Sequence, residues 1–251
     1  AQQAGAECIV LCDTNGGMLP EEFRALYAAA AEAVSAPLGI HTHNDSGCAA
    51  ANTFQAVQLG AVHVQGTING LGERCGNANL CTIIPGLQLK LGYAVLAPER
   101  LARLTEASVF VSEVANISHD IRQPYVGEAA FSHKAGTHAD GVRKVRRSFE
   151  HVPPESVGNA RRFVVSDQAG TSTILAKLTN IAPGVSKRDP RVRAVLKRIL
   201  ALEAEGFQFE AADASFELVV REMLGQFREP FDVNGFRTIG EHLESGDIRA
   251  E

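Results

Sequence analysis

The chain has 251 residues, 45% of them hydrophobic, and a net charge of −5 from 24 basic and 29 acidic side chains. This length suits one large domain or a domain plus a smaller one, and the slight excess of acid argues against a nucleic-acid-binding face. No apolar run approaches the ~20 residues that span a bilayer, no secretory leader is visible, and the five cysteines lack disulfide or zinc spacing, so we expect no membrane contact and a cytoplasmic location.

Residues 8–91 predict three units of a strand followed by a helix. The regular interval between short apolar runs is typical of a parallel α/β architecture. The predicted strands are 8–11, 38–43 and 62–65, and the predicted helices are 20–34, 49–59 and 80–91. In the first helix the apolar side chains recur every three or four residues, which predicts one buried face. That face comprises Phe23, Leu26, Tyr27, Ala30 and Val34.

The pattern changes after residue 92. Residues 98–116 predict one or two helices, whereas residues 118–170 lack periodicity and contain four histidines. Long irregular stretches in compact domains are usually functional. Further elements are predicted as helices over 171–178, 191–205 and 214–226 and as a strand over 231–239.

His41 and His43 lie at the end of the second predicted strand. Successive strand side chains alternate between faces, so both histidines point the same way while Thr42 points to the other face. This spacing suits two ligands of one metal ion, and in barrels of parallel strands the carboxyl end carries the active site. The alternative is a pair of histidines that hydrogen-bond within a polar rim.

Glycine-rich segments follow the third and the first predicted strands. The run from Gly70 to Asn77 is one residue too long for a dinucleotide fingerprint, and we expect it to aim Asn77 at the site as a neutral oxygen ligand. After the first strand, Thr14 or nearby backbone amides could hold a substrate carboxylate. Both segments have a simpler interpretation as plain turns.

The segment from Phe131 to Gly141 combines two histidines, a lysine and an aspartate. Such groups suit acid–base chemistry near neutral pH, with His133 and His138 as the candidates. The alternative is that these are exposed loop histidines without a catalytic role.

Three long motifs together resemble the metal-dependent condensing enzymes of the 2-isopropylmalate, homocitrate and citramalate synthase family. These motifs are residues 41–45, 65–80 and 131–140. Details that favour the citramalate synthase branch lie within 12–17, 76–80 and 149–159. The resemblance covers nearly the whole chain, from about Glu7 to Arg237.

The resemblance implies an α/β fold in which the last three units of a (β/α)8 TIM barrel are followed by a mostly helical subdomain. The implied domains are the barrel portion, helical linkers with the catalytic histidine segment, and the start of a C-terminal regulatory domain, at 1–95, 96–208 and 209–251. The family's strands that carry a metal aspartate and a catalytic glutamate have no counterpart here. We therefore expect a chain that is truncated at both ends and inactive by itself.

The same resemblance implies roles for single residues. His41, His43 and Asn77 match metal ligands, and the implied cofactor is a divalent metal (Mg, Mn or Zn). Thr14 matches a residue that contacts the 2-oxoacid. His138 matches the catalytic histidine, which the family's homodimer lends from the partner subunit. The implied reaction condenses acetyl-CoA with pyruvate to give (R)-citramalate and CoA.

Phe149 departs from the family pattern, which often has a tyrosine at this position. A phenyl ring cannot donate the hydrogen bond of a tyrosine hydroxyl, so that role is absent here or met elsewhere. Other interpretations remain open at this point. A 2-isopropylmalate or homocitrate synthase would differ only in the 2-oxoacid, a lyase resembling 3-hydroxy-3-methylglutaryl-CoA lyase would share the two histidines, and an inactive fragment or interaction module would have no turnover.

Overall fold

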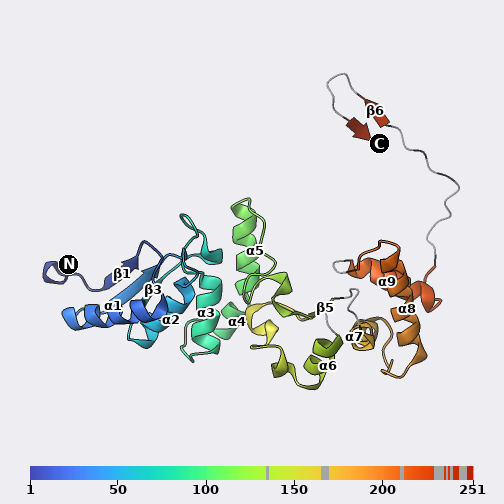
Figure 1. The fold of residues 1–251 in the computed structure, drawn as a ribbon, viewed down its shortest axis with the longest axis horizontal. Coiled ribbons are helices and arrows are strands. Elements are labelled where there is room, and N and C mark those ends of the chain that lie inside the picture. Colours follow the sequence, from blue (N-terminus) through green and yellow to red (C-terminus); the bar gives the residue numbers. More distant parts are fainter. Residues whose placement is uncertain are drawn as a thin grey trace. The chain divides into compact units, whose positions relative to one another are not determined.

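The computed structural model describes residues 1–133, 136–164, 170–209 and 212–228, and near the end residues 235, 237, 240–242 and 248–250 (Figure 1). It divides into two compact units, Ala1–Thr173 and Ile174–Glu251. The first unit contains the sheet and all the predicted site residues. The three-part division expected from the sequence stays a prediction.

A parallel sheet of three strands opens the first unit. Its strands are β1 (Ile9–Asp13), β2 (Leu38–Thr42) and β3 (His63–Gln65), in that spatial order. A helix follows each strand, and these are α1 (Pro20–Ala33), α2 (Ala49–Gln58) and α3 (Leu80–Leu89) (Figure 1). The predicted alternation of strand and helix is therefore confirmed for these three units.

One face of the sheet packs against the helices. Phe23 and Tyr27 of α1 are buried in a cluster with Leu38 and Ile40 of β2. The prediction for Leu26 is wrong, because this side chain is 46% exposed. At 100° per residue Leu26 lies at the margin of the apolar stripe, whereas Phe23 and Tyr27 lie near its centre.

The opposite face of the sheet is lined by two rows of residues of mixed polarity. A Cβ added at Gly39 would lie 3.0 Å from both the Val10 Cγ2 atom and the His63 Cβ atom, so these three residues form one row across the strands on this face. The strand register forms the next row toward the carboxyl ends from Cys12, His41 and Gln65. The histidine pair thus lies on the face that the helices do not cover.

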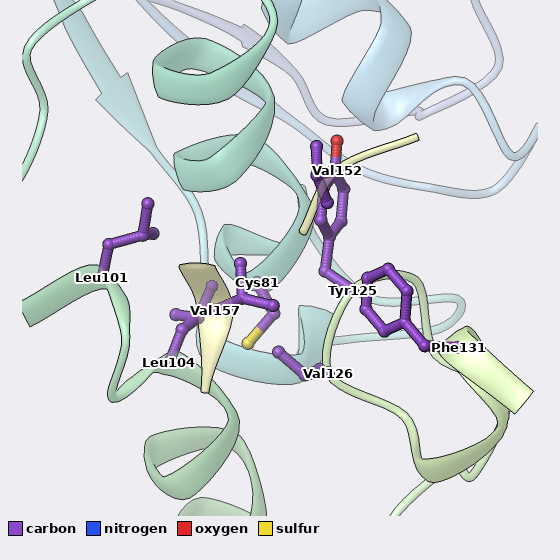
Figure 2. Close-up of a cluster of buried hydrophobic side chains, with 8 residues drawn as sticks. All are labelled: Cys81, Leu101, Leu104, Tyr125, Val126, Phe131, Val152 and Val157. Carbon is purple, nitrogen blue, oxygen red and sulfur yellow. The ribbon is translucent and has the colours of Figure 1, made fainter. Parts of the chain in front are cut away.

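A second core joins the sheet units to the helices that follow. The stretch 98–116, for which one or two helices were predicted, forms two: α4 (Pro98–Leu101) and α5 (Leu104–Val114). Figure 2 shows the buried cluster in which Cys81 of α3 meets side chains from these helices and from later loops. The cluster consists of Cys81, Leu101, Leu104, Tyr125, Val126, Phe131, Val152 and Val157.

The stretch 118–170 is more regular than its sequence suggests. It contains the helix α6 (Gly136–Lys144), and two short strands, β4 (Ser132–His133) and β5 (Arg162–Phe163), pair in parallel. The expectation of an irregular stretch is therefore wrong for these residues. A glycine inside α6 lowers helix propensity, so local sequence alone did not favour this helix.

The second unit is helical over most of its described residues. Its helices are α7 (Thr171–Ile181), whose first three residues still belong to the first unit, α8 (Pro190–Ala204) and α9 (Asp213–Met223). The three helices predicted for this region are confirmed. An antiparallel pair, β6 (Gly240–His242) and β7 (Ile248–Ala250), follows. The strand predicted over 231–239 lies outside the described residues except at 235 and 237. None of the described helices is long and apolar enough to cross a membrane.

Single 3₁₀ turns link several of these elements. They span Gln2–Ala4, Ile68–Gly70, Glu128–Phe131, Arg146–Ser148 and Pro154–Val157.

Asn69 fastens the loop after β3 to α5. Its amide nitrogen donates to the Ser108 carbonyl at 2.8 Å and to the Ser112 hydroxyl oxygen at 2.9 Å. Its amide oxygen accepts from the Ser108 hydroxyl at 2.5 Å and from the Gln123 amide at 3.1 Å. The backbone of Asn69 has a positive φ of 61°, a conformation that asparagine tolerates well. The side chain therefore holds together segments that are distant in sequence.

We predict that Asn69→Gly lowers the free energy of unfolding of the full-length protein by about 2 to 4 kcal/mol, because buried donors and acceptors lose their partner. Glycine keeps the positive φ, so backbone strain does not contribute. Asn116→Gly is the matched control, since Asn116 also has a positive φ of 53° but is exposed. Urea unfolding measures both variants, and equal effects of the two would contradict the role given to Asn69.

Candidate active site

The loops at the carboxyl ends of the three strands are joined by backbone hydrogen bonds. The amide of His43 donates to the Asp13 carbonyl at 3.2 Å, and the amide of Asn44 donates to the Gly76 carbonyl at 2.9 Å. The amide of Ser46 donates to the Gly16 carbonyl at 2.9 Å. The glycine-rich segments after β1 and β3 therefore lie on either side of the histidine motif, as expected for strands that end at one edge.

His41 and His43 lie side by side at this edge. Their ring centroids are 5.3 Å apart, with 64° between the ring planes. Both residues are half-buried, and His43 forms an isolated β-bridge with Asn77. The structure therefore brings the two imidazoles together and places Asn77 directly beside the second one.

Two buried polar atoms of these residues lack a hydrogen-bond partner. They are the Nδ1 atom of His43 and the Oδ1 atom of Asn77. The Asn77 amide nitrogen donates to the Leu71 carbonyl at 3.1 Å, which fixes the amide and leaves its oxygen free. A Cβ at Gly72 would lie 2.3 Å from that nitrogen, so a side chain at position 72 would displace the Asn77 amide from this position. An unpaired amide oxygen beside imidazole nitrogens is a donor set that fits a divalent cation.

The same donor set lacks an anionic ligand. Within the described part of the chain, no three histidine, cysteine, aspartate or glutamate side chains gather as a metal-binding group. Two imidazoles and one amide oxygen are neutral and leave coordination positions for other ligands. The assignment of His41, His43 and Asn77 as metal ligands stays a prediction.

Arg74 forms an ion pair at the rim of this site. Its Nε atom lies 2.8 Å from Asp45 Oδ1 and its Nη2 atom 3.1 Å from Asp45 Oδ2, and the same nitrogen donates to the Thr14 carbonyl at 2.6 Å. The hydrogen bond from Arg74 holds the pKa of the Asp45 carboxyl below its usual value. Thr14 is exposed and lies beside this pair, which positions its backbone.

His138 lies on α6 and is exposed. Its ring stacks on Phe149, with centroids 4.3 Å apart and 29° between the planes. Among the described contacts, none joins His138 to His41, His43 or Asn77. Its catalytic role stays a prediction.

A buried ionic cluster supports the segment that carries His138. His133 Nε2 lies 3.2 Å from Glu150 Oε1, and Arg161 binds both carboxylate oxygens of Glu150, with its Nε at 2.5 Å. Burial raises the pKa of the Glu150 carboxyl, but the hydrogen bonds from Arg161 and His133 outweigh burial and leave that pKa below its usual value. The chain before α6 is thereby tied to the chain after it. His133 thus has a structural partner.

Sequence reasoning did not single out Asp45, Arg74, Glu150 or Arg161 as members of these pairs. An arginine within a glycine-rich run was the available sequence signal for Arg74, because a charged side chain in such a loop indicates a specific partner. The structure adds that Arg74 has a positive φ of 56°, which is uncommon for a residue other than glycine. Glu150 and Arg161 come from an aperiodic stretch, and no spacing rule predicts their contact.

Comparison with known proteins finds two family models that match successive parts of the chain. Residues 1–111 match the family model described as HMGL-like, and residues 125–206 match the model described as homocitrate synthase post-HMGL domain-like. The first match contains the strand-end site and the second contains the His138 segment. The two matches and the curated relatives described below make the chain similar to the 2-isopropylmalate, homocitrate and citramalate synthase family. The predicted fold class, a TIM-barrel portion followed by a helical subdomain, is confirmed.

The curated proteins that resemble this chain include several (R)-citramalate synthases. The chain is 49% identical over 241 residues to the (R)-citramalate synthase of Geobacter sulfurreducens, which covers 96% of this chain and 46% of the relative. It is 48% identical over 245 residues to the (R)-citramalate synthase of a Synechocystis species, which covers 94% of this chain and 45% of the relative. The chain spans about half the length of the curated relatives it matches.

Solved structures are more distant. The HMG-CoA lyase of Bacillus subtilis is 25% identical, with a match that covers 47% of this chain and 41% of that chain at a TM-score of 0.41. Similarity at this level adds nothing to the argument for the fold.

We predict that Glu150→Gln flattens the acid side of the stability curve of the full-length protein. Because the folded pKa lies below the unfolded value of ~4.3, the carboxylate contributes stability that is fully present above the unfolded pKa and is lost as pH falls through the folded pKa. At pH 7 we expect a loss of about 2 to 4 kcal/mol, since the Arg161 side chain, only 17% exposed, keeps its charge without the carboxylate that balances it. Urea unfolding at a series of pH values measures this.

The control for this experiment is Glu128→Gln, because Glu128 is 65% exposed and lies 3.6 Å from Arg162. Exposed pairs contribute about 0 to 1 kcal/mol, so this variant should follow the parent closely. Parallel curves for the parent and Glu150→Gln between pH 7 and the acid range would contradict the assignment.

Proposed function

We propose that the protein containing this chain is an acyltransferase that condenses acetyl-CoA with pyruvate to give (R)-citramalate and CoA. The observation that carries this proposal is the identity of 44% to 49% with five curated (R)-citramalate synthases, over 94% to 98% of the chain. The strand-end site described above lies entirely within the matched region.

The proposed metal site uses His41, His43 and Asn77. The unpaired Oδ1 atom of Asn77 and the neighbouring imidazoles of the HxH motif would hold a divalent cation such as Mg²⁺, Mn²⁺ or Zn²⁺. When bound, the metal would polarise the ketone of the 2-oxoacid. A further anionic ligand would come from outside the described residues.

Thr14 is proposed to contact the 2-oxoacid. Arg74 binds the Thr14 carbonyl and Asp45 together, so the turn after β1 is held in one position at the rim of the site. A fixed turn with an exposed hydroxyl is suited to receive a substrate carboxylate. The Asp45 carboxylate neutralises Arg74, which leaves orientation of the turn as the main contribution of the pair.

His138 is proposed as the acid–base residue. In the reaction a proton leaves the methyl group of acetyl-CoA, the resulting carbon bonds to the ketone carbon, and the ketone oxygen takes up a proton. Water then cleaves the thioester and releases CoA. An imidazole near neutral pH can hold or accept a proton at a ring nitrogen in such steps. We further propose a homodimer in which His138 serves the site of the partner subunit.

A homocitrate synthase is the second candidate. The match of residues 125–206 to the homocitrate synthase post-HMGL model favours it, and the two activities differ in the 2-oxoacid. The 2-oxoacid that the enzyme prefers therefore distinguishes the two candidates.

We expect the full-length protein to release CoA thiol from acetyl-CoA with pyruvate at a kcat/KM at least tenfold above that with 2-oxoglutarate or 2-oxoisovalerate. The reason is that a pocket built for the pyruvate methyl group excludes larger side chains. A thiol reagent follows the release, and omission of the 2-oxoacid gives the background rate. A preference for 2-oxoglutarate would establish the second candidate and contradict the first.

His138→Ala should lower kcat of the full-length enzyme by about 10² to 10⁴ while the dissociation constants of the metal and of pyruvate stay nearly unchanged. A group that acts only in the proton-transfer step contributes little to the binding of metal and substrate in the ground state. Mixing this variant with His41→Ala should restore part of the activity, since a mixed dimer has one intact site. Normal turnover, or a defect confined to metal binding, would remove His138 from the proposed role.

A further inference from the structure

His138 and Gly141 lie on the same face of α6. They are three residues apart, and residues at this spacing are neighbours on a helix surface. The chain leaves α6 through the 3₁₀ turn Arg146–Ser148 and then reaches Phe149. Phe149 folds back onto the face formed by His138 and Gly141.

The absence of a side chain at Gly141 makes this contact possible. A Cβ atom at Gly141 would lie 2.5 Å from the Cε2 atom and 3.1 Å from the Cδ2 atom of Phe149, so the phenyl ring occupies the space that a side chain would need. The ring then reaches His138, with its centroid 4.3 Å from the imidazole centroid and only 29° between the planes. The arrangement is a stacked aromatic pair over a glycine.

Burial alone does not explain the position of Phe149, because this residue is 46% exposed. The described contacts of its ring are with the His138 and Gly141 face of α6. A large apolar ring that stays half in solvent gains little from the hydrophobic effect compared with a core phenylalanine such as Phe131, which is 2% exposed. The stacking on His138 is therefore the specific interaction of this ring.

We propose that Phe149 is a positioning residue for His138 and that Gly141 provides the space for it. This inference rests on the proposed function, since it takes His138 as the acid–base group. A free histidine on a helix surface rotates about its side-chain bonds, and stacking restricts that rotation. The phenyl ring has no proton to move, so it acts on turnover only through the orientation of the imidazole.

The inference gives an account of the phenylalanine found where the family often has a tyrosine. The ring plane is what both residues share, and the stack requires only the ring. We therefore expect that Phe149→Tyr keeps the stack and that Phe149→Leu removes it. Gly141→Ala should also remove the stack, although alanine favours a helix more than glycine does.

The first measurement is steady-state kinetics of the full-length enzyme. We expect Phe149→Leu and Gly141→Ala to lower kcat about tenfold, with KM for pyruvate within twofold of the parent, because an aromatic pair contributes an effect of this size. Phe149→Tyr should keep kcat within twofold. Thr137→Ala, which alters an exposed side chain next to His138, is the matched control and should behave as the parent.

The second measurement does not depend on turnover. In the full-length protein with labelled histidine, stacking on a phenyl ring shifts the ring-proton resonances of His138 upfield, and the missing signals in His138→Ala identify them. We expect the shift in the parent, in Thr137→Ala and in Phe149→Tyr. It should be lost in Phe149→Leu and Gly141→Ala, while thermal unfolding shows that Gly141→Ala is at least as stable as the parent.

The outcomes separate this inference from the proposed function. Full turnover in His138→Ala would refute the catalytic role of His138 and the inference with it. A large loss in His138→Ala together with normal kcat and normal His138 resonances in Phe149→Leu would overturn only the positioning role of Phe149. A loss of kcat in Phe149→Tyr as large as in Phe149→Leu would also overturn it.

Discussion

The parallel register of β1, β2 and β3 is the constraint on which the site depends. Because Cys12, His41 and Gln65 are aligned across the three strands, the strands end at one edge and their following loops meet there. The alternation of side chains along each strand then separates the apolar residues from the histidine pair. Apolar residues face α1 and α2, and the histidine pair faces the opposite side. A shift of one residue in β2 would send both imidazoles into the apolar layer.

The strand-end loops derive their geometry from this register. Backbone hydrogen bonds join the segment after β1 to the histidine motif and join that motif to the glycine-rich run after β3. Asn69 then ties the same run to α5, and the second core extends the connection to the loops around Tyr125 and Val157. The site therefore rests on two cores, and damage to either one would disturb the position of Asn77.

Local periodicity predicted the parts of the structure that it controls. The strand alternation placed His41 and His43 on one face, and the apolar stripe of α1 identified Phe23 and Tyr27 as buried. Leu26 was wrongly predicted as buried, because the burial of a residue at the margin of the stripe depends on what packs beside it. The glycine-rich surroundings of Asn77 indicated a tight loop but not the position of its amide. That position depends on hydrogen bonds within the loop and with the histidine motif, which periodicity does not predict.

Long-range pairs account for what the sequence did not predict. Helix α6 contains Gly141, which lowers helix propensity, and the reason for this glycine becomes visible only when Phe149 is seen lying over it. Likewise, Glu150 finds Arg161 and His133 through the fold of an aperiodic stretch. In both cases the decisive partner is outside the window that a periodicity argument covers.

Gly39 has a consequence for how this sheet can vary among related chains. Its missing side chain leaves the space that the Val10 and His63 side chains occupy on either side. A larger residue at position 39 would press against the Val10 side chain, the His63 Cβ atom and the His63 carbonyl oxygen, which lie 3.0 to 3.1 Å from an added Cβ. The side chains at positions 10, 39 and 63 are therefore sterically coupled, and position 39 at the centre is the most restricted of the three, in the row next to the one that contains His41.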